Sequence, residues 1–424
     1  MKPPHSASSH TDKTHREDIE SLTVDQASNL LSRWVIPIHE LEEVPILDAL
    51  NRVIAMDVIS PMDVPPHDNS AMDGYAFEGT HLQVAQILTL KVVGIAYAGR
   101  AWQGAVQKGE CIKIMTGAVL PSGLNTVVPQ ELCTVTGQHI SFDTSQISEG
   151  QNRRKQGEDL KKNTPAILRG TRVTPAAMGL LASLGLSTVH VNRRIKVAYF
   201  STGDELLNLG ETPREGSIYD SNRYSLFGLL ADLGCTVLDR GVIPDQPAHL
   251  ENAFRKAASE ADVVITTGGV SGGDADFTKA ILQKLGDVAF WKIDMRPGRP
   301  MAVGQLTTAE GSAMLFGLPG NPVAAMVTFL AFVKPYLLKI MGSTEWPQPL
   351  LRAQTKEVLS KKPGRTEYQR GIARRNEQGD LEVISTGHQG SGILSSMVQA
   401  NCLIVLSHAQ STAQVGDWVD VMML

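Results

Sequence analysis

Apolar and polar positions change their spacing along the chain, and the changes divide it into blocks. Near the N-terminus, LTVDQASNLLSRWV places apolar side chains at 24, 27, 30, 31 and 34, which is the spacing of an amphipathic helix. Thr23 and Gln26, three residues apart, predict a capping box at its start. We therefore expect a helix over this stretch.

The second block, from about residue 63 to 163, has short apolar runs separated by glycine and proline. Runs such as LTLKVVGIAYAG, CIKIMTGAV and CTVTGQHISF predict a small all-β domain. After the charged connection EGQNRRKQGEDLKK, the stretch TPAAMGLLASLG predicts a helix, with Pro175 in its first turn and Gly185 past its end.

From residue 194, apolar strands alternate with helices. The strands are RIKVAYF, TVLDRGVI, ADVVITT and SAMLF, and a long helix follows the tight turn GLPGNP. Such alternation predicts a parallel sheet covered by helices on both faces. Beyond the proline-marked linker STEWPQPL, five short strands predict a C-terminal β barrel or sandwich: LRAQTKEVL, EYQRGIARR, LEVIST, NCLIVL and WVDVMML.

Composition narrows the class of protein. A chain of 424 residues is long enough for two to four domains, and a net charge of −5 argues against nucleic acid or membrane partners. The sequence shows no signal peptide, and we expect a cytoplasmic protein in which Cys111, Cys133, Cys235 and Cys402 are buried free thiols. Residues 1–20 have almost no large apolar side chains and are expected to be a disordered tail.

Ligands of an open parallel sheet bind beyond the carboxyl ends of its strands, so the loops there are the candidate site. These loops are STGDEL (201–206), IPDQ (243–246), TTGGVSGGDAD (266–276), DMRPGRP (294–300) and GLPGNP (317–322). Their glycines let a ligand approach the backbone, and the helices that follow offer free N–H groups to anions. Neither a P-loop nor a G-x-G-x-x-G motif is present.

Acidic residues in these loops form a second pattern. They are Asp204, Glu205, Asp245, Asp274 and Asp276. Three cations stand near them, namely Lys292, Arg296 and Arg299. A single loop aspartate is usually a helix cap or solvated, but Mg²⁺ prefers one or two carboxylates together with substrate phosphate oxygens. The pattern therefore predicts that these acids bind a metal ion and that this metal ion binds a phosphate group of the ligand.

Eight motifs in this order resemble the molybdopterin molybdenumtransferases of molybdenum cofactor biosynthesis, including the C-terminal part of gephyrin. They are NSAMDGYAF, IMTGA, GEDL, TPAAMGLLASLG, STGDEL, TTGGVSGGDADFTK, RPGRP and GLPGNPVAA. The resemblance covers the chain from about residue 20 to its end, and the combination is specific although no single motif is.

The resemblance implies a multidomain α/β plus β fold in an elongated homodimer. Its regions would be an N-terminal region at 21–193, with linking segments at 41–62 and 164–193 around an inserted β domain at 63–163, an α/β molybdopterin-binding domain at 194–341, and a C-terminal β barrel at 342–424. The active cleft would lie between the α/β domain of one subunit and the inserted domain of the other.

The implied reaction is Mg²⁺-dependent insertion of molybdate into adenylylated molybdopterin, which releases AMP and molybdenum cofactor. The motifs place catalytic residues at Asp73, Thr116, Asp159, Glu205, Asp245 and Asp276, of which Glu205, Asp245 and Asp276 would be the metal ligands. They place substrate-binding residues at Thr202, Gly203, Thr267, Gly268, Gly269, Ser271, Asp274, Lys292, Arg296, Arg299, Pro319, Gly320 and Pro322. The resemblance also allows contact with molybdopterin adenylyltransferase and with molybdoenzyme chaperones.

Two other functions remain open on the sequence. A molybdopterin adenylyltransferase, which acts one step earlier, uses the same α/β domain, but it needs neither the NSAMDGYA domain nor the C-terminal barrel. A non-enzymatic scaffold like gephyrin would need further partner-binding domains or long linkers, and this chain offers only a 20-residue tail.

Overall fold

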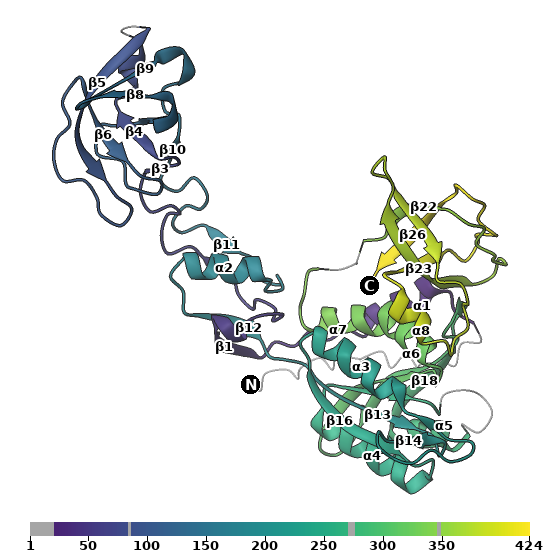
Figure 1. Cartoon of the computed structure of the whole chain (residues 1–424). Coiled ribbons are helices and arrows are strands. Elements are labelled where there is room, and N and C mark those ends of the chain that lie inside the picture. The colour runs from purple at the N-terminus through teal and green to yellow at the C-terminus, as the bar shows by residue number, and fades with distance from the viewer. Residues whose placement is uncertain (1–20, 84–85, 270–275, 346–348) are drawn as a thin grey trace, which may run out of the picture.

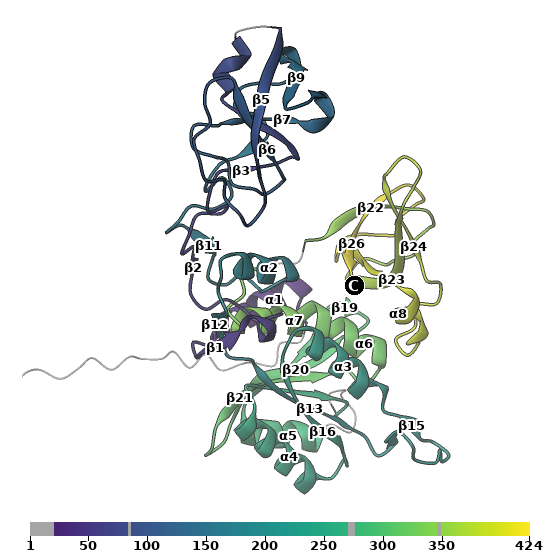
Figure 2. The same ribbon diagram turned by 60° about the vertical axis from the view of Figure 1, so that its left-hand side comes forward.

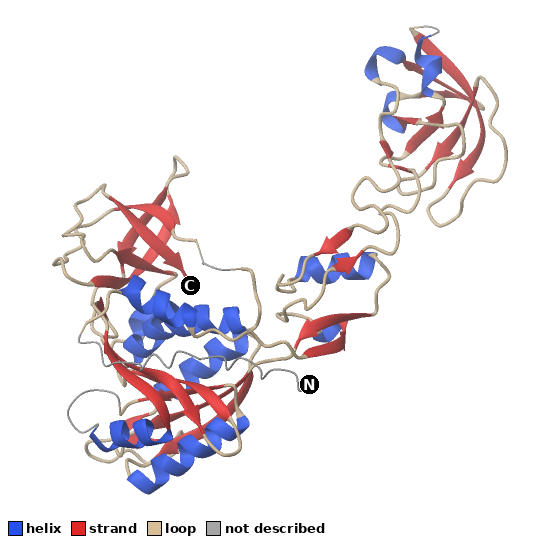
Figure 3. Cartoon of the chain, turned by 180° about the vertical axis from the view of Figure 1, so that it is seen from behind, coloured by secondary structure: helices blue, strands red, loops and turns tan. Residues whose placement is uncertain are grey.

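The computed structural model describes residues 21–83, 86–269, 276–345 and 349–424, so the tail predicted at 1–20 lies outside the described residues. Figures 1 and 2 show an elongated molecule, with one β body at one end, a larger α/β body and a barrel at the other, and slender linking segments between them. Figure 3 shows the longer helices in the larger body and the linking segments, while the inserted β body carries only short helical turns.

The predicted N-terminal helix is present as α1 (Val24–Arg33), and its capping box is confirmed. The Thr23 hydroxyl accepts a hydrogen bond from the Gln26 N–H, and the Gln26 side chain accepts one from the Thr23 N–H. The helix packs on the α/β body, where the rings of Trp34 and Trp291 lie 5.4 Å apart. The capping box thus fixes the start of α1, and the contact between Trp34 and Trp291 holds its end against the α/β body.

Segments on both sides of the inserted sheet pair with each other. Strand β1 (Leu41–Pro45) runs antiparallel to β12 (Thr188–Asn192), and β2 (Val58–Ile59) runs antiparallel to β11 (Pro165–Ile167). Between them lies α2 (Pro175–Ser183), which Thr174 caps as the sequence predicts. The short turn η1 (Ile46–Asp48) completes this linking region.

The inserted body is one sheet in the order β7-β4-β6-β5-β9-β8. Alternate residues of β4 enter different cores, since Tyr75 and Phe77 pack on one face and Ala76 on the other. The strands are β4 (Gly74–Phe77), β5 (Ile87–Ala96), β6 (Glu110–Ile114), β7 (Thr126–Pro129), β8 (Thr134–Thr136) and β9 (His139–Asp143). Beside them lie β3 (Asn69–Ser70), its partner β10 (Arg153–Arg154), and the short turns η2 (Gly79–Gln83), η3 (Gln130–Leu132) and η4 (Thr144–Gln146).

The α/β sheet has the order β16-β13-β17-β21-β20-β18. Its strands are β13 (Lys196–Thr202), β16 (Thr236–Ile243), β17 (Val263–Thr267), β18 (Gly286–Lys292), β20 (Pro300–Thr307) and β21 (Ser312–Leu318). The predicted parallel pairing holds for β16, β13, β17 and β21, whereas β20 runs antiparallel to both neighbours. The sheet is therefore mixed, because β20 and β21 form a hairpin that apolar spacing alone does not reveal.

Helices cover both faces of this sheet, as the sequence predicts. Val197 and Tyr199 of β13 pack with α3 (Ser221–Asp232), while Ala198 and Phe200 pack with α4 (Pro247–Glu260) and α5 (Asp276–Leu285). A short parallel pair, β14 (Leu206–Leu207) with β15 (Ile218–Tyr219), follows β13.

The predicted long helix is α6 (Pro322–Thr328), a π-helical turn η5 (Phe329–Val333) and α7 (Lys334–Ile340) in succession. Within the described residues it is the one helix long and apolar enough to cross a membrane, and 78% of its apolar window is buried inside the protein. Figure 1 shows it between the sheet and the barrel, which is the position of a core helix.

The C-terminal strands close into a barrel. They are β22 (Leu351–Thr355), β23 (Thr366–Arg375), β24 (Leu381–Ser385), β25 (Cys402–Leu406) and β26 (Trp418–Met423), and the pairing of β23 with β25 completes the ring. The short helix α8 (Ser395–Gln399) was not predicted. Strand β19 (Met295–Arg296), from the α/β body, adds to β23 from outside.

Candidate active site

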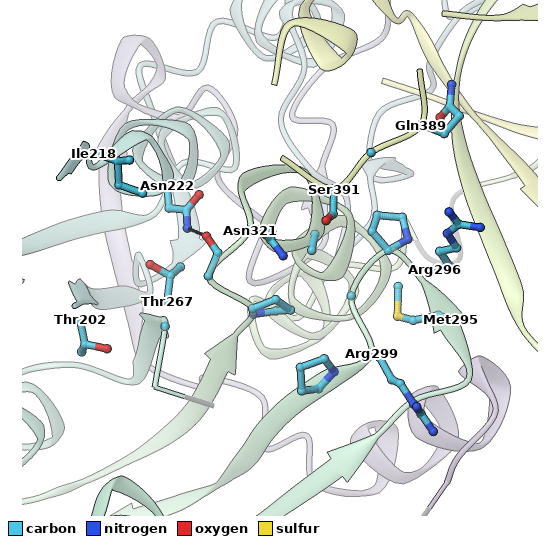
Figure 4. A pocket seen from close by; sticks show the side chains of 18 of the residues that line it. Thr202, Ile218, Asn222, Thr267, Met295, Arg296, Arg299, Asn321, Gln389 and Ser391 are labelled. Carbon is cyan, nitrogen blue, oxygen red and sulfur yellow. Dashed lines mark hydrogen bonds between the residues drawn. The ribbon is translucent and has the colours of Figure 1, made fainter. Parts of the chain in front are cut away.

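The carboxyl ends of the α/β strands border a cavity of about 690 Å³ that also reaches the barrel. Figure 4 shows Thr202 and Thr267 at the strand ends, Arg296 and Arg299 on the opposite wall, and Gln389 and Ser391 arriving from the C-terminal region. The four predicted loops that fall among the lining residues are those after β13, β17, β18 and β21. The prediction that the loops meet at one edge therefore holds for these four, whereas no residue of the fifth predicted loop, IPDQ (243–246), lines the cavity.

Glycines shape the two loops nearest the sheet. Gly203 has φ +147° and Gly268 has φ +87°, which only glycine adopts without strain. A Cβ on Gly268 would lie 2.5 Å from the Thr202 carbonyl oxygen, and a Cβ on Gly203 would collide with the Glu205 carboxylate. The absence of side chains here lets Glu205 fold back over the backbone and face the cavity it lines.

Three acids, Asp204, Glu205 and Asp245, lie near one another in the loops after β13 and β16. The Asp245 N–H donates to the Asp204 carboxylate at 3.2 Å, so the loop after β16 joins the loop after β13. Burial raises the pKa of Asp245, and the nearby negative charges of Asp204 and Glu205 raise it further. Across the described part of the chain, no three His, Cys, Asp or Glu side chains converge as a ready-made metal cage. The arrangement is an acidic edge with oxygen donors rather than a closed metal centre.

Cations line the opposite side. Arg296 and Arg299 both line the cavity. The side chain of Arg296 is 64% exposed, and its guanidinium lies 3.8 Å from the Glu367 carboxylate. Arg365, which the sequence reasoning missed, contributes from the loop before β23. Lys292, at the exposed end of β18, is not among the lining residues. Among the described residues, Glu205 is therefore the one acid that lines the cavity, together with three arginines, whereas Asp204 and the predicted metal ligand Asp245 do not line it.

The turn before α6 is fixed by contacts that sequence patterns did not identify. The Asn222 amide donates to the Gly320 carbonyl at 2.7 Å, and the Val323 N–H donates to the Ser391 carbonyl at 3.0 Å. Pro319 and Gly320 line the cavity, and Pro322 is the first residue of α6. Asn321, at the N-cap, makes no side-chain cap bond, and both Asn321 and Ala324 line the cavity.

Asp73 and Thr116 lie in the inserted body, away from this cavity. The Asp73 carboxylate accepts from the Thr116 N–H at 2.7 Å and from its hydroxyl at 2.8 Å, and these two bonds lower the pKa of Asp73. Asp159 is exposed on the return from the inserted sheet. Figure 1 shows β4 and β6, which these two residues flank, at the far end of the molecule from α6. Within one chain, these predicted residues are not brought to the cavity.

The structure describes the loop after β17 only in part. Ser271 and Asp274 lie outside the described residues. Asp276 is the first residue of α5, but its side chain is not described, and Gly269, with φ +67°, is the last described residue of its loop.

Of the four predicted buried thiols, Cys111, Cys235 and Cys402 are buried and free, while Cys133 is only half-buried.

Comparison with known proteins covers nearly the whole chain. Residues 22–185 match a model described as "MoeA N-terminal region (domain I and II)", residues 198–339 match a "Probable molybdopterin binding domain", and residues 352–424 match a "MoeA C-terminal region (domain IV)".

Curated relatives and a solved structure agree with these matches. A molybdopterin molybdenumtransferase of Haemophilus influenzae is 44% identical over 94% of this chain and 98% of its own, and one of Nostoc is 34% identical over 98% and 97%. A crystal structure of a molybdopterin biosynthesis MoeA protein from Pyrococcus horikoshii aligns with a TM-score of 0.79 at 28% identity, over 96% of this chain and 100% of that one. The chain therefore belongs to the MoeA family of molybdopterin molybdenumtransferases, which are transferases of molybdenum cofactor biosynthesis.

Proposed function

We propose that this enzyme inserts molybdate into adenylylated molybdopterin, with Mg²⁺, and releases AMP and molybdenum cofactor. The observation that carries the proposal is one cavity that Glu205 lines from the loop after β13 and that Arg296 and Arg299 line from the segment between β18 and β20. A substrate that carries both a diphosphate and an incoming oxyanion needs a metal on one side and cations on the other.

The acidic edge fits Mg²⁺ by its chemistry. Asp204, Glu205 and Asp245 supply oxygen donors only. Burial raises the pKa of Asp245, the charges of Asp204 and Glu205 raise it further, and a divalent cation would relieve this repulsion. Mg²⁺ commonly takes one or two protein carboxylates and completes its shell with substrate oxygens and water. Glu205 and Asp245, with Asp276, would hold the ion, which would neutralise charge on the phosphoanhydride that is cleaved.

The chain's own groups orient the substrate. The turns at Gly203 and Gly268 bring backbone to the cavity wall, so a pterin diphosphate can approach the main chain there. Asn321, at the N-cap of α6, lines the same cavity, and its amide makes no cap bond to the helix. Arg296, Arg299 and Arg365 are placed to attract molybdate and to compensate the charge of the diphosphate.

We infer further that the enzyme works as a homodimer in the cytoplasm. Asp73 and Thr116 are held together by two hydrogen bonds but lie in the body farthest from the cavity. A second subunit could bring this pair to the cavity of the first, and the cleft would then be shared between subunits.

The direct test is AMP release from adenylylated molybdopterin with Mg²⁺ and molybdate. We expect turnover that stops without molybdate or after chelation of Mg²⁺. Glu205→Gln should reduce it at least about tenfold, because the neutral amide is a poor Mg²⁺ ligand. Glu215→Gln changes an exposed acid ten residues further along the chain; it is the matched control and should retain full rate.

The same assay separates the alternatives. An adenylyltransferase would instead consume ATP and molybdopterin and release pyrophosphate, and a scaffold would do neither. Absence of AMP release by the folded wild-type protein would therefore reject the proposal.

A further inference from the structure

The chain passes between the linking region and the inserted sheet twice, and we call these two crossings, residues 60–68 and 153–164, the neck. Figures 1 and 2 show the inserted sheet standing off at the end of this neck. Whatever fixes the neck therefore fixes the position of Asp73 and Thr116 relative to the rest of the molecule.

Backbone hydrogen bonds join the two crossings along their length. The Ser60 N–H donates to the Thr164 carbonyl at 2.9 Å. The Val64 N–H donates to the Leu160 carbonyl at 2.8 Å, and the Leu160 N–H donates back to the Val64 carbonyl at 3.2 Å. Nearer the sheet, the Gly157 N–H donates to the Pro65 carbonyl at 3.0 Å. The neck is therefore a paired ribbon rather than two independent linkers.

Two carboxylates of the outgoing crossing clamp the returning one. Asp63 accepts from the Lys162 N–H and from the Gln156 side-chain amide, both at 2.8 Å. Asp68 accepts from the Gln156 N–H at 2.7 Å and forms an ion pair with Arg153. Gln156 thus bridges both carboxylates, one through its side chain and the other through its backbone.

These bonds also surround Asp159. Its N–H donates to the Val64 carbonyl at 3.0 Å, and it lies between the two residues, Gln156 and Lys162, that Asp63 holds. Hydrogen bonds to a carboxylate are shorter and stronger than those between neutral groups. The clamp is therefore placed to set both the angle of the inserted sheet and the local path of the chain at Asp159.

We propose that Asp63, Asp68 and Gln156 are positioning residues, which hold the inserted sheet at a fixed angle so that Asp73 and Thr116 reach the cavity of a second subunit. The proposal rests on the shared cleft proposed above. None of the three touches the cavity: they act on the reaction only through the geometry of the neck.

The first arm of the test measures that geometry directly. Spin labels on Val135→Cys in the inserted sheet and Lys256→Cys on α4 report their distance distribution, in a Cys133→Ser background because Cys133 is the half-buried native thiol. Labelled subunits are diluted into unlabelled ones, so that only distances within one subunit contribute. Asp63→Ala and Gln156→Ala should widen the distribution relative to the parent.

Two further variants make this arm specific. Asp63→Asn should keep the parent width, because its amide can accept from the Lys162 N–H and donate to a rotated Gln156 amide. Glu158→Ala is the matched control, since Glu158 accepts only from Lys155 of its own crossing among its described contacts, at 2.8 Å. An unchanged width in Asp63→Ala would overturn the proposal.

The second arm measures AMP release by the same variants without labels. Asp63→Ala should lower kcat about tenfold with little change in KM, because a misplaced group costs rate rather than ground-state binding. Asp63→Asn should restore the rate. A wider distribution with wild-type kcat would also overturn the proposal. If the wild-type protein released no AMP, the proposed function would fail, and the distance widths alone would decide whether the clamp exists.

Discussion

The hydrogen bond from the Asp245 N–H to the Asp204 carboxylate joins two loops that lie 41 residues apart in sequence. It places a third acid next to Asp204 and Glu205, and the resulting repulsion raises the pKa of Asp245 after burial has already raised it. Such crowding of like charges costs folding free energy, and sites of this kind are typical of function rather than of stability.

Removal of that charge should stabilise the folded protein at neutral pH. The folded chain holds the Asp245 proton more tightly than the unfolded chain does, so stability is lost as pH rises from the ordinary value of 3.8 through the raised one. Asp245→Asn should therefore raise Tm by about 1–3 °C at pH 7 without Mg²⁺, and the gain should vanish below about pH 4. Thermal melts across this range, with Glu215→Gln as control, measure it. A lower Tm at pH 7 would contradict the acidic edge.

The shared cleft that we propose predicts complementation between two inactive variants. Glu205→Gln disables the cavity side and Asp73→Ala the inserted side, so a mixed dimer retains one intact site formed from the unmutated halves. Random mixing after co-expression should restore about a quarter of wild-type AMP release, because half of the dimers are mixed and each has one working site of two. Each variant alone sets the baseline. Lack of recovery in dimers verified by mass would place both residues in the same subunit's site.

The loop after β17 predicts unequal roles for its two aspartates. Asp276→Asn should lower activity at least about tenfold and raise the Mg²⁺ requirement, because Asn binds Mg²⁺ poorly, whereas loss of one negative charge from the first turn of α5 should cost at most about 1 kcal/mol of stability. Asp274→Asn should be milder. A Mg²⁺ titration of turnover measures both, and the reversed order of severity would transfer the ligand role to Asp274.

The capping box predicts a stability effect without a catalytic one. Thr23→Ala removes the hydroxyl that accepts from the Gln26 N–H and should cost about 1 kcal/mol in the free energy of unfolding. Thr23→Ser should retain that bond and most of the stability. Urea unfolding followed by tryptophan fluorescence suits this test, since Trp34 and Trp291 stack near α1. Loss of turnover at full stability would give this helix a different role.

Much of the fold could be predicted because its signals are local. The Thr23 and Gln26 pair fixes the start of α1, and Thr174 with Pro175 fixes that of α2. The edge of the sheet where the loops meet followed from β-α alternation alone. The hairpin that makes β20 antiparallel did not, because an apolar run such as PMAVGQLT carries no information on strand direction.

The site was predictable only where its residues share one sheet edge. Glu205, Thr202 and Thr267 follow strands, so topology gathers them. Arg365, Gln389 and Ser391 reach the cavity from the C-terminal region, and nothing in their local sequence indicates which surface they meet. The Asp73–Thr116 bond spans 43 residues between two turns, and each turn read separately shows only ordinary turn residues.

Strand β19 has a consequence for how such proteins can be recombined. Met295 and Arg296 belong by sequence to the α/β body, yet they pair with Thr366 and Glu367 of the barrel, and the Thr366 N–H donates to the Asp294 carbonyl at 2.9 Å. A chimera that exchanges only the C-terminal region between relatives would break a β ladder at the same loop that carries Arg296 and Arg299 into the cavity. The α/β body and the barrel are separate in chain order, but the pairing of β19 with β23 ties the sequence of one to the sequence of the other. The unit to exchange is therefore the barrel together with residues 294–300.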